Sequence, residues 1–148
     1  MNRKDFSLEI ARQIGAFQLL HFKSDIKPNT KADVLDLVSF VDTESQEMFE
    51  KKVQELFPED EILGEETYSK TKDYNTKSLW IIDPLDGTLS YLRKFKEWGP
   101  MIAYVENGKV EFSVLYMPFH DELYVADQTG AYCNDMKISV SDVDSLEY

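Results

Sequence analysis

The amino-terminal part of the chain carries apolar residues at helical spacing. Five of them follow one another at intervals of three or four residues: Phe6, Ile10, Ile14, Phe17 and Leu20. This spacing predicts an amphipathic helix from about Asp5 to His21. A stripe of this kind packs into a core far more often than it holds a cofactor, so we expect these side chains to face the interior.

The apolar pattern changes after this helix and then returns. Residues 24–30 are rich in turn-forming residues, and residues 31–41 alternate without a clear period, which favours an extended segment. Residues 43–57 predict a second helix. Its apolar stripe consists of Phe49, Val53 and Leu56. Thr43 and Gln46 form a capping-box pattern at its start.

Short apolar runs in the rest of the chain predict strands separated by turns. Asn107-Gly108 stands between two such runs and is a strong hairpin signal. We expect strands at residues 62–64, 79–82, 100–106, 109–116, 123–126, 131–133 and 138–140, and a loop or irregular hairpin at residues 68–78. Two helices followed by consecutive antiparallel strands predict an α+β domain, with the helices packed on a mostly antiparallel sheet.

Composition and charge exclude several classes of partner. The 148 residues are 43% hydrophobic and 30% charged, which is typical of a single globular domain, residues 1–148. A formal net charge of −12 argues against nucleic acid or an anionic membrane surface as a partner. The single cysteine, Cys133, cannot form an internal disulfide, and no signal peptide or membrane-spanning run is evident, so we expect a cytoplasmic location. His21 and His120 show no metal-ligand spacing.

One stretch, Asp83-Pro84-Leu85-Asp86-Gly87-Thr88, follows an apolar run and carries the candidate chemistry. Because proline restricts the residue before it, we expect the strand to stop at Asp83. The glycine and threonine then suit a tight turn into a short helix over residues 89–94. Carboxylates bind hard cations such as Mg²⁺, and free amides at a helix start bind phosphate. The stretch therefore suits metal-assisted phosphate chemistry.

Two other interpretations of this stretch compete with the metal site. Asp-Pro and Asp-Gly pairs are common in turns, and an Asp before a helix is often only a cap. An EF-hand needs an oxygen ligand at its third position and a Glu at its twelfth, whereas counting from Asp83 gives Leu85 and Lys94. The EF-hand is excluded. A second acidic cluster upstream, Gly64-Glu65-Glu66-Thr67, weakens the turn interpretation.

Together, the two acidic clusters resemble the inositol monophosphatase family of Mg²⁺-dependent, lithium-sensitive phosphatases. That family carries a Gly-Glu-Glu element followed by Trp-Ile-Asp-Pro-Ile/Leu-Asp-Gly-Thr. Both occur here in order and at similar spacing, as Gly64-Glu65-Glu66 and the run from Trp80 to Thr88. Residues 31–42 resemble the family's entry into its second helix, and residues 130–134 resemble one of its strands and turns. The resemblance covers nearly the whole chain.

The resemblance implies a fold and a two-metal site. The expected fold is the amino-terminal domain of the inositol monophosphatase and sugar phosphatase fold. Glu65, Asp83 and the backbone carbonyl of Leu85 would bind a first Mg²⁺, and Asp83 with Asp86 would bind a second. Thr88 and Glu65 would be the catalytic residues that orient and deprotonate a water molecule.

The same resemblance implies roles for neighbouring residues. Asp86 and the backbone amides of Gly87 and Thr88 would bind the substrate phosphate. Asp42 would act on an outer metal ion through water, would cap the second helix, or would do both. Adjacent strand residues face opposite sides, so Glu66 would point away from the ions.

The chain departs from the family pattern in two places. The family commonly continues Gly-Thr-Thr-Asn-Phe, whereas this chain has Gly87-Thr88-Leu89-Ser90-Tyr91. Relatives that act on nucleotide bisphosphate, fructose bisphosphate or NADP are therefore alternatives to an inositol phosphatase. The sequence also lacks a Trp-Asp-x-Ala-Ala-Gly element before Tyr148, so we expect the family's carboxy-terminal domain, with its last metal ligand, to be absent.

Two classes of function follow from these patterns. The first is a phosphomonoesterase that hydrolyses a small phosphorylated metabolite through metal-activated water and forms a homodimer, as family members commonly do. The second is a truncated, non-catalytic metal-binding or interaction module with an uncovered sheet edge that pairs with a partner. A structural domain with acidic turns is the remaining alternative.

Overall fold

The amino-terminal apolar stripe forms the helix that it predicts. The computed structural model describes residues 1–23, 31–65, 67, 69, 74 and 76–144, with the backbone alone for residues 31–39. Helix α1 spans Arg3–Phe22, and the Asn2 side chain caps it by accepting a hydrogen bond of 2.8 Å from the Asp5 backbone N–H. Leu20, expected in the core, is 70% exposed because it lies off the buried face, which Gln18 occupies instead.

The second helix begins well before the position indicated by the sequence. Helix α2 spans Lys31–Leu56, so residues 31–41 are helical rather than extended, and Thr43 lies inside the helix instead of capping it. No proline or glycine occurs in this span to interrupt the helix. Asp42 is therefore an interior helix residue, and the interpretation of Asp42 as a cap is wrong. Residues 24–30, expected as a turn-rich connection, lie outside the described residues.

Among the residues that the structure describes, seven strands form one sheet in chain order. They are β1 Glu61–Gly64, β2 Ser78–Asp86, β3 Gly99–Glu106, β4 Lys109–Met117, β5 Glu122–Asp127, β6 Gly130–Cys133 and β7 Met136–Ile138. The pair β1 and β2 is parallel, and each later pair is antiparallel. The predicted hairpin at Asn107-Gly108 is confirmed, with positive φ at both residues. Of the loop expected at residues 68–78, positions 68, 70–73 and 75 lie outside the described residues.

The last strand and the central strand differ from their predicted limits. β7 ends at Ile138, where the sequence pattern placed its start, because a turn with positive φ at Asn134 and Asp135 brings the chain back earlier. β2 does not stop at Asp83 but continues to Asp86. The residues that extend β2 do not pair with β1, so the absence of an N–H group at Pro84 removes no hydrogen bond between these two strands. A register shift between Asp83 and Asp86 in the pairing with β3 bends the strand end.

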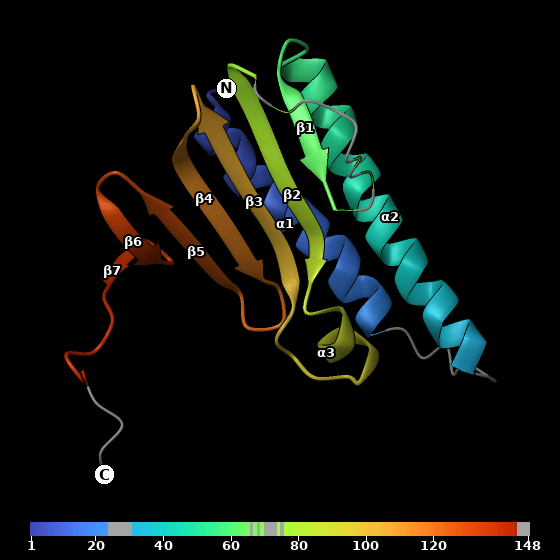
Figure 1. Ribbon diagram of the computed structural model, residues 1–148. Helices are drawn as coiled ribbons and strands as arrows, with labels where there is room; N and C mark the ends of the chain where they lie inside the picture. Colours follow the sequence, from blue (N-terminus) through green and yellow to red (C-terminus); the bar gives the residue numbers. More distant parts are fainter. Residues whose placement is uncertain (24–30, 66, 68, 70–73, 75, 145–148) are drawn as a thin grey trace.

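Both long helices lie on the same face of the sheet, and the short helix α3, Thr88–Leu92, lies at the end of β2 (Figure 1). This arrangement confirms the predicted α+β class with helices on a mostly antiparallel sheet. Within the part of the chain that the structure describes, no helix is long and apolar enough to cross a membrane.

The main core is built around Trp80, which is fully buried. Aromatic rings contact it from α1, from α2 and the residue that follows it, and from strands β3 and β4: Phe6, Phe49, Phe57, Tyr104 and Phe112. Its indole N–H donates to Asp60 at 3.0 Å, and the same carboxylate accepts two hydrogen bonds from Arg3 at 2.7 and 2.8 Å. The indole N–H of Trp80 and the carboxylate of Asp60 are therefore paired. Leu56, expected in this core, is 47% exposed because it ends α2.

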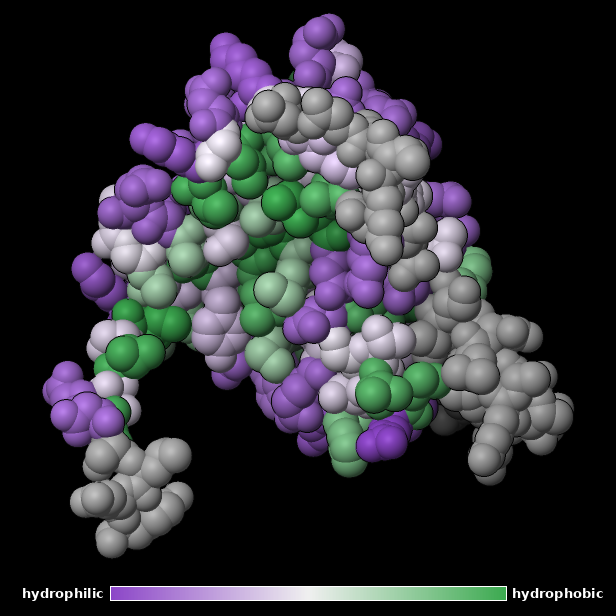
Figure 2. All heavy atoms as spheres, in the orientation of Figure 1, coloured by the Kyte–Doolittle hydropathy of each residue, from purple (hydrophilic) through white to green (hydrophobic). Residues whose placement is uncertain are grey.

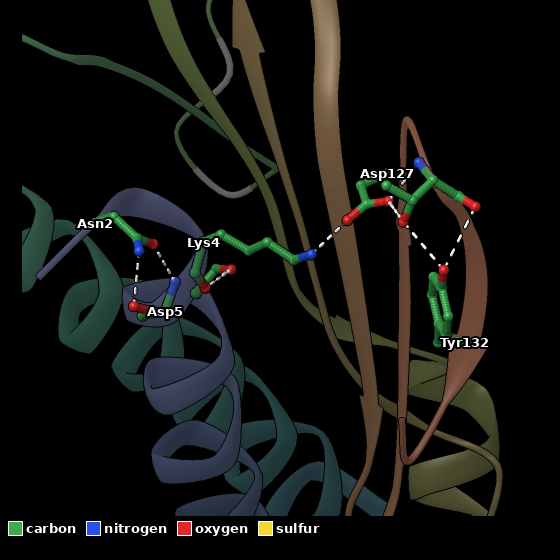
Figure 3. Close-up of polar contacts among 7 residues, drawn as sticks. Asn2, Lys4, Asp5, Asp127 and Tyr132 are labelled. Atoms are coloured by element: carbon green, nitrogen blue, oxygen red, sulfur yellow. Dashed lines mark hydrogen bonds and ion pairs between the residues drawn. The ribbon is translucent and has the colours of Figure 1, made fainter. Parts of the chain in front are cut away.

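An ion pair fixes the amino-terminal end of α1 to the sheet. Lys4 on α1 pairs with Asp127 at the end of β5 (Figure 3). Asp127 also accepts a hydrogen bond of 2.7 Å from the Thr129 backbone N–H. The hydrogen bond from Lys4 is the main cause that holds the pKa of Asp127 well below its usual range, and the bonds from Thr129 add to it. The helix is thus tied down at the end that lies far from the acidic clusters.

The face of the sheet opposite the helices is apolar and open. Figure 2 shows hydrophobic residues gathered over the middle of this face. They surround a hollow of about 260 Å³. Its apolar lining includes Ile81, Met101, Ala103, Leu115, Val125 and Ile138. The outer strands β1 and β7 have only four and three residues, so the strand edges of the sheet are short.

Gly99→Ala should destabilise the domain strongly. A Cβ atom at Gly99 would lie 1.8 Å from the backbone carbonyl oxygen of Tyr116, which no rotamer change can relieve. We expect a loss of about 3 kcal/mol or more in the free energy of unfolding, measured by urea denaturation. Gly108→Ala is the matched control, because its Cβ would meet no atom within 4 Å and only its positive φ costs about 1–2 kcal/mol. Equal losses in both variants would contradict this account.

Candidate metal and phosphate site

The parallel pairing of β1 and β2 brings the two acidic clusters together. Gly64 and Ile82 are the last pair of this ladder, so the residues that follow them, Glu65 and Asp83, lie side by side at the same end of the sheet, where β1 ends and β2 continues. The Glu65 backbone N–H donates to the Ile82 carbonyl at 3.1 Å and continues the ladder. The side chain of Glu65 lies close enough to Asp83 to raise the pKa of that carboxyl. Two predicted metal ligands therefore meet.

The surroundings of Asp83 raise the pKa of its carboxyl. Burial is the largest cause that raises the pKa of Asp83, and the charge of Glu65 and its hydrogen bond follow, so that the pKa reaches about 7. Asp86 adds a smaller repulsion, and the Leu85 backbone N–H opposes the shift by donating to Asp83 Oδ1 at 3.1 Å. The pair therefore retains a proton near neutral pH, in a place where a bound cation would remove the repulsion.

The turn after β2 has the predicted geometry. Gly87 has φ +82°, and a Cβ there would lie 2.6 Å from the Glu97 carbonyl oxygen, so both backbone conformation and space require glycine. α3 follows from Thr88, whose hydroxyl donates to the Leu85 carbonyl at 3.1 Å. Because α3 is only five residues long, the phosphate-binding role of the Gly87 and Thr88 amides rests on the family resemblance.

The other predicted ligands are less closely gathered. Asp86 is exposed at the end of β2 and acts on Asp83 through its charge. Asp42 is 8% exposed on α2, beside Val41, which packs in the same apolar cluster as Leu85. Glu66 lies outside the described residues.

An all-oxygen donor set fits a hard cation. No group of three or more acidic, histidine or cysteine side chains converges as a metal site among the residues that the structure describes. The candidate site presents two neighbouring carboxylates, Glu65 and Asp83, and the charge of Asp86 acts on Asp83. It also presents the backbone carbonyl of Leu85. Carboxylate and carbonyl oxygens are the ligands that Mg²⁺ prefers, so these residues suit the expected ion.

Buried polar residues that sequence reasoning missed support the site. Gln18 on α1 donates to the Pro84 carbonyl at 2.6 Å and to Ser45 on α2 at 3.2 Å, and both side chains are fully buried. Their signal in the sequence is a polar residue on an apolar stripe, since Gln18 follows Ile14, and Ser45 precedes Phe49, by four residues.

A further contact from α2 holds the chain around Glu65. Gln46 donates to the Thr67 hydroxyl at 2.9 Å. Gly64 packs so tightly against the Gln46 side chain that a Cβ would lie 2.6 Å from it. Gln46, predicted as part of a helix cap, instead positions the segment that carries a candidate ligand.

Comparisons with known proteins identify the family to which the chain is similar. A profile of the inositol monophosphatase family matches residues 3–147. A Thermotoga maritima protein named fructose-1,6-bisphosphatase/inositol-1-monophosphatase is 34% identical over 148 residues, which is 99% of this chain and 56% of that protein. Inositol-1-monophosphatase of Bacillus subtilis is 34% identical over 129 residues, which is 86% of this chain and 49% of that protein.

Solved structures confirm the fold. The structure of a Thermotoga maritima IMPase matches with a TM-score of 0.79 and 31% identity, covering 99% of this chain and 57% of that chain. Inositol monophosphatase II from Staphylococcus aureus matches with a TM-score of 0.83 over 95% of this chain and 52% of that one, and its 23% identity supports the fold alone. The chain spans about half the length of the curated relatives it matches.

Asp83→Asn should stabilise the metal-free domain at neutral pH. The pKa of Asp83 is about 7 in the folded state against an ordinary 3.8, so the folded state binds more protons between these values and loses stability as the pH rises through them. Asparagine carries no charge and can still donate to Glu65. We expect the melting temperature of the variant to be about 2 °C or more above that of the unsubstituted protein at pH 7.5 in EDTA.

Thermal unfolding followed by circular dichroism tests this expectation. The difference between the two proteins should shrink as the pH falls to 4, where the Asp83 carboxyl is protonated in the folded state. Asp86→Asn is the matched control and should have a smaller effect, since Asp86 is the weaker source of repulsion. A difference of the same size at both pH values would contradict the assigned cause.

Proposed function

The chain belongs to the inositol monophosphatase family, and from this we propose that it carries the metal-binding part of a phosphatase that acts on a small phosphorylated metabolite. One observation supports the proposal above the others. Glu65 and Asp83, from two separate sequence elements, meet at the ends of parallel strands next to the turn at Gly87. Such a carboxylate pair beside a turn suits metal-assisted hydrolysis of a phosphate ester.

In this proposal Glu65, Asp83, Asp86 and the Leu85 carbonyl hold Mg²⁺. When bound, the metal lowers the pKa of a coordinated water and neutralises charge on the phosphate. The Thr88 hydroxyl donates its hydrogen bond to the Leu85 carbonyl, so the lone pairs of the hydroxyl oxygen remain available to accept a hydrogen bond from the attacking water. Glu65 is exposed at the end of its strand and accepts the water's proton.

The substrate proposed first is an inositol monophosphate, as in the names of several relatives. Fructose 1,6-bisphosphate is the second candidate, because the name of the Thermotoga maritima relative includes both activities. The 64% exposed Leu89 beside Thr88, in place of the family's usual threonine, supports testing both. By the family resemblance we also propose inhibition by lithium and assembly as a homodimer.

Glu65→Gln and Thr88→Val should each abolish most of the phosphate release. The test is Mg²⁺-dependent release of phosphate from inositol 1-phosphate and from fructose 1,6-bisphosphate, with and without lithium. Removing a group that orients or deprotonates the attacking water should lower kcat by about 10²-fold or more. Glu59→Gln is the matched control and should leave kcat unchanged, because Glu59 is an exposed carboxylate that precedes β1, at the end of this strand opposite to Glu65.

The same assay separates the two classes of function. Release that is unaffected by Glu65→Gln contradicts the proposed catalytic site. Absence of release, together with Mg²⁺ binding by calorimetry that Asp83→Asn removes, supports the non-catalytic metal-binding module instead. Absence of both contradicts the metal site.

A further inference from the structure

Gln18 occupies the junction of three elements around the site. It is fully buried where α1 meets α2, the end of β2 and α3. Its side-chain amide donates to the Pro84 carbonyl at 2.6 Å and to the Ser45 hydroxyl at 3.2 Å. Its backbone carbonyl accepts a hydrogen bond of 2.9 Å from the Tyr91 hydroxyl on α3. A single residue of α1 therefore contacts the metal-site strand, the second helix and the short helix.

The Pro84 carbonyl and the Leu85 N–H belong to the same peptide group. Gln18 holds the oxygen end of this group, and the nitrogen end donates to Asp83 Oδ1 at 3.1 Å. Since the peptide is planar, fixing its oxygen also fixes the direction of its N–H. A hydrogen bond accepted at the carbonyl also polarises the peptide and strengthens the bond that its N–H donates. The contacts form a relay from Gln18 to the Asp83 carboxylate.

We propose that Gln18 is a positioning residue that orients the Asp83 carboxylate for cation binding through the Pro84–Leu85 peptide. It does not touch the cation itself. The inference rests on the proposed metal site at Asp83 and adds to it a residue of α1 that lies 65 or more positions away along the chain.

The unsatisfied atom of Gln18 argues against a purely structural role. Among the described residues its Oε1 is buried without a hydrogen-bond partner. A buried acceptor of this kind is unfavourable, and an apolar side chain of similar size would avoid it while filling the same space. For packing alone, the Gln18 amide is therefore less favourable than an apolar side chain of similar size. Its N–H group, however, donates the hydrogen bond to Pro84 that no apolar side chain can make.

The first test compares cation affinity in two variants that disturb the same residue differently. Gln18→Met keeps the size of the side chain and removes the donor to Pro84. Tyr91→Phe removes the hydrogen bond to the Gln18 backbone and leaves the relay intact. With Mn²⁺ as the probe, followed by the electron paramagnetic resonance of the free ion, Gln18→Met should weaken binding about 10-fold or more. Tyr91→Phe should lower the melting temperature and change the Mn²⁺ affinity by less than about 2-fold. Equal weakening in both variants would overturn the proposal.

The second test measures, in the absence of metal, whether Gln18 orders the Pro84–Leu85 peptide. In EDTA, the exchange rate of the Leu85 amide proton, followed by NMR, should rise about 10-fold or more in Gln18→Met and stay unchanged in Tyr91→Phe. An unchanged rate in Gln18→Met overturns the relay even if the original protein binds Mn²⁺. Failure of the original protein to bind Mn²⁺ overturns the proposed metal site, and the exchange rate then decides the relay alone. If Gln18→Met does not fold, Gln18→Asn, whose shorter amide cannot reach Pro84, takes its place with the same expected results.

Discussion

The enforced contact between Glu65 and Asp83 is the constraint on which the rest of the site depends. Burial is the largest cause of the raised pKa of Asp83, and repulsion between the two neighbouring carboxylates raises it further. Parallel pairing of β1 with β2 makes the contact unavoidable, because Glu65 and Asp83 directly follow Gly64 and Ile82, the last pair of residues in that pairing. A divalent cation is the simplest partner for such a pair, since it satisfies both carboxylates at once.

The surrounding structure holds this unfavourable arrangement from two sides. On the helix side, Gln46 packs against Gly64 while Gln18 holds the Pro84 carbonyl, so both strand ends have contacts to helices. On the core side, Trp80 anchors β2 within a cluster of aromatic rings, and the carboxylate of Asp60 satisfies its indole N–H. The stability of the aromatic core offsets the strain at the strand ends, a division that is common where function requires locally unfavourable contacts.

Some features could be predicted because their causes are local. The Asn107-Gly108 hairpin depends on residues that adopt positive φ easily, and the Gly87 turn depends on the same property. Other predictions failed where local signals were weak or misleading. Helix α2 does not begin at the capping pattern of Thr43. Residues 31–42 contain no proline or glycine, so the helix extends through them and Thr43 lies inside it. The proline after Asp83 did not end β2, because that part of the strand has no β1 neighbour and needs no N–H there.

The sequence by itself determined the order of the motifs, the α+β class and the identity of Glu65, Asp83, Gly87 and Thr88 as candidate residues, because these depend on residue type and spacing. The tertiary structure decided which of them meet, since the parallel register of two strands is not encoded in either strand alone. It also decided that Gln18 and Ser45, polar residues on apolar helix faces, support the site. A polar residue that is buried on an apolar helix face needs a hydrogen-bond partner, and only the packing of the elements decides which group that partner is.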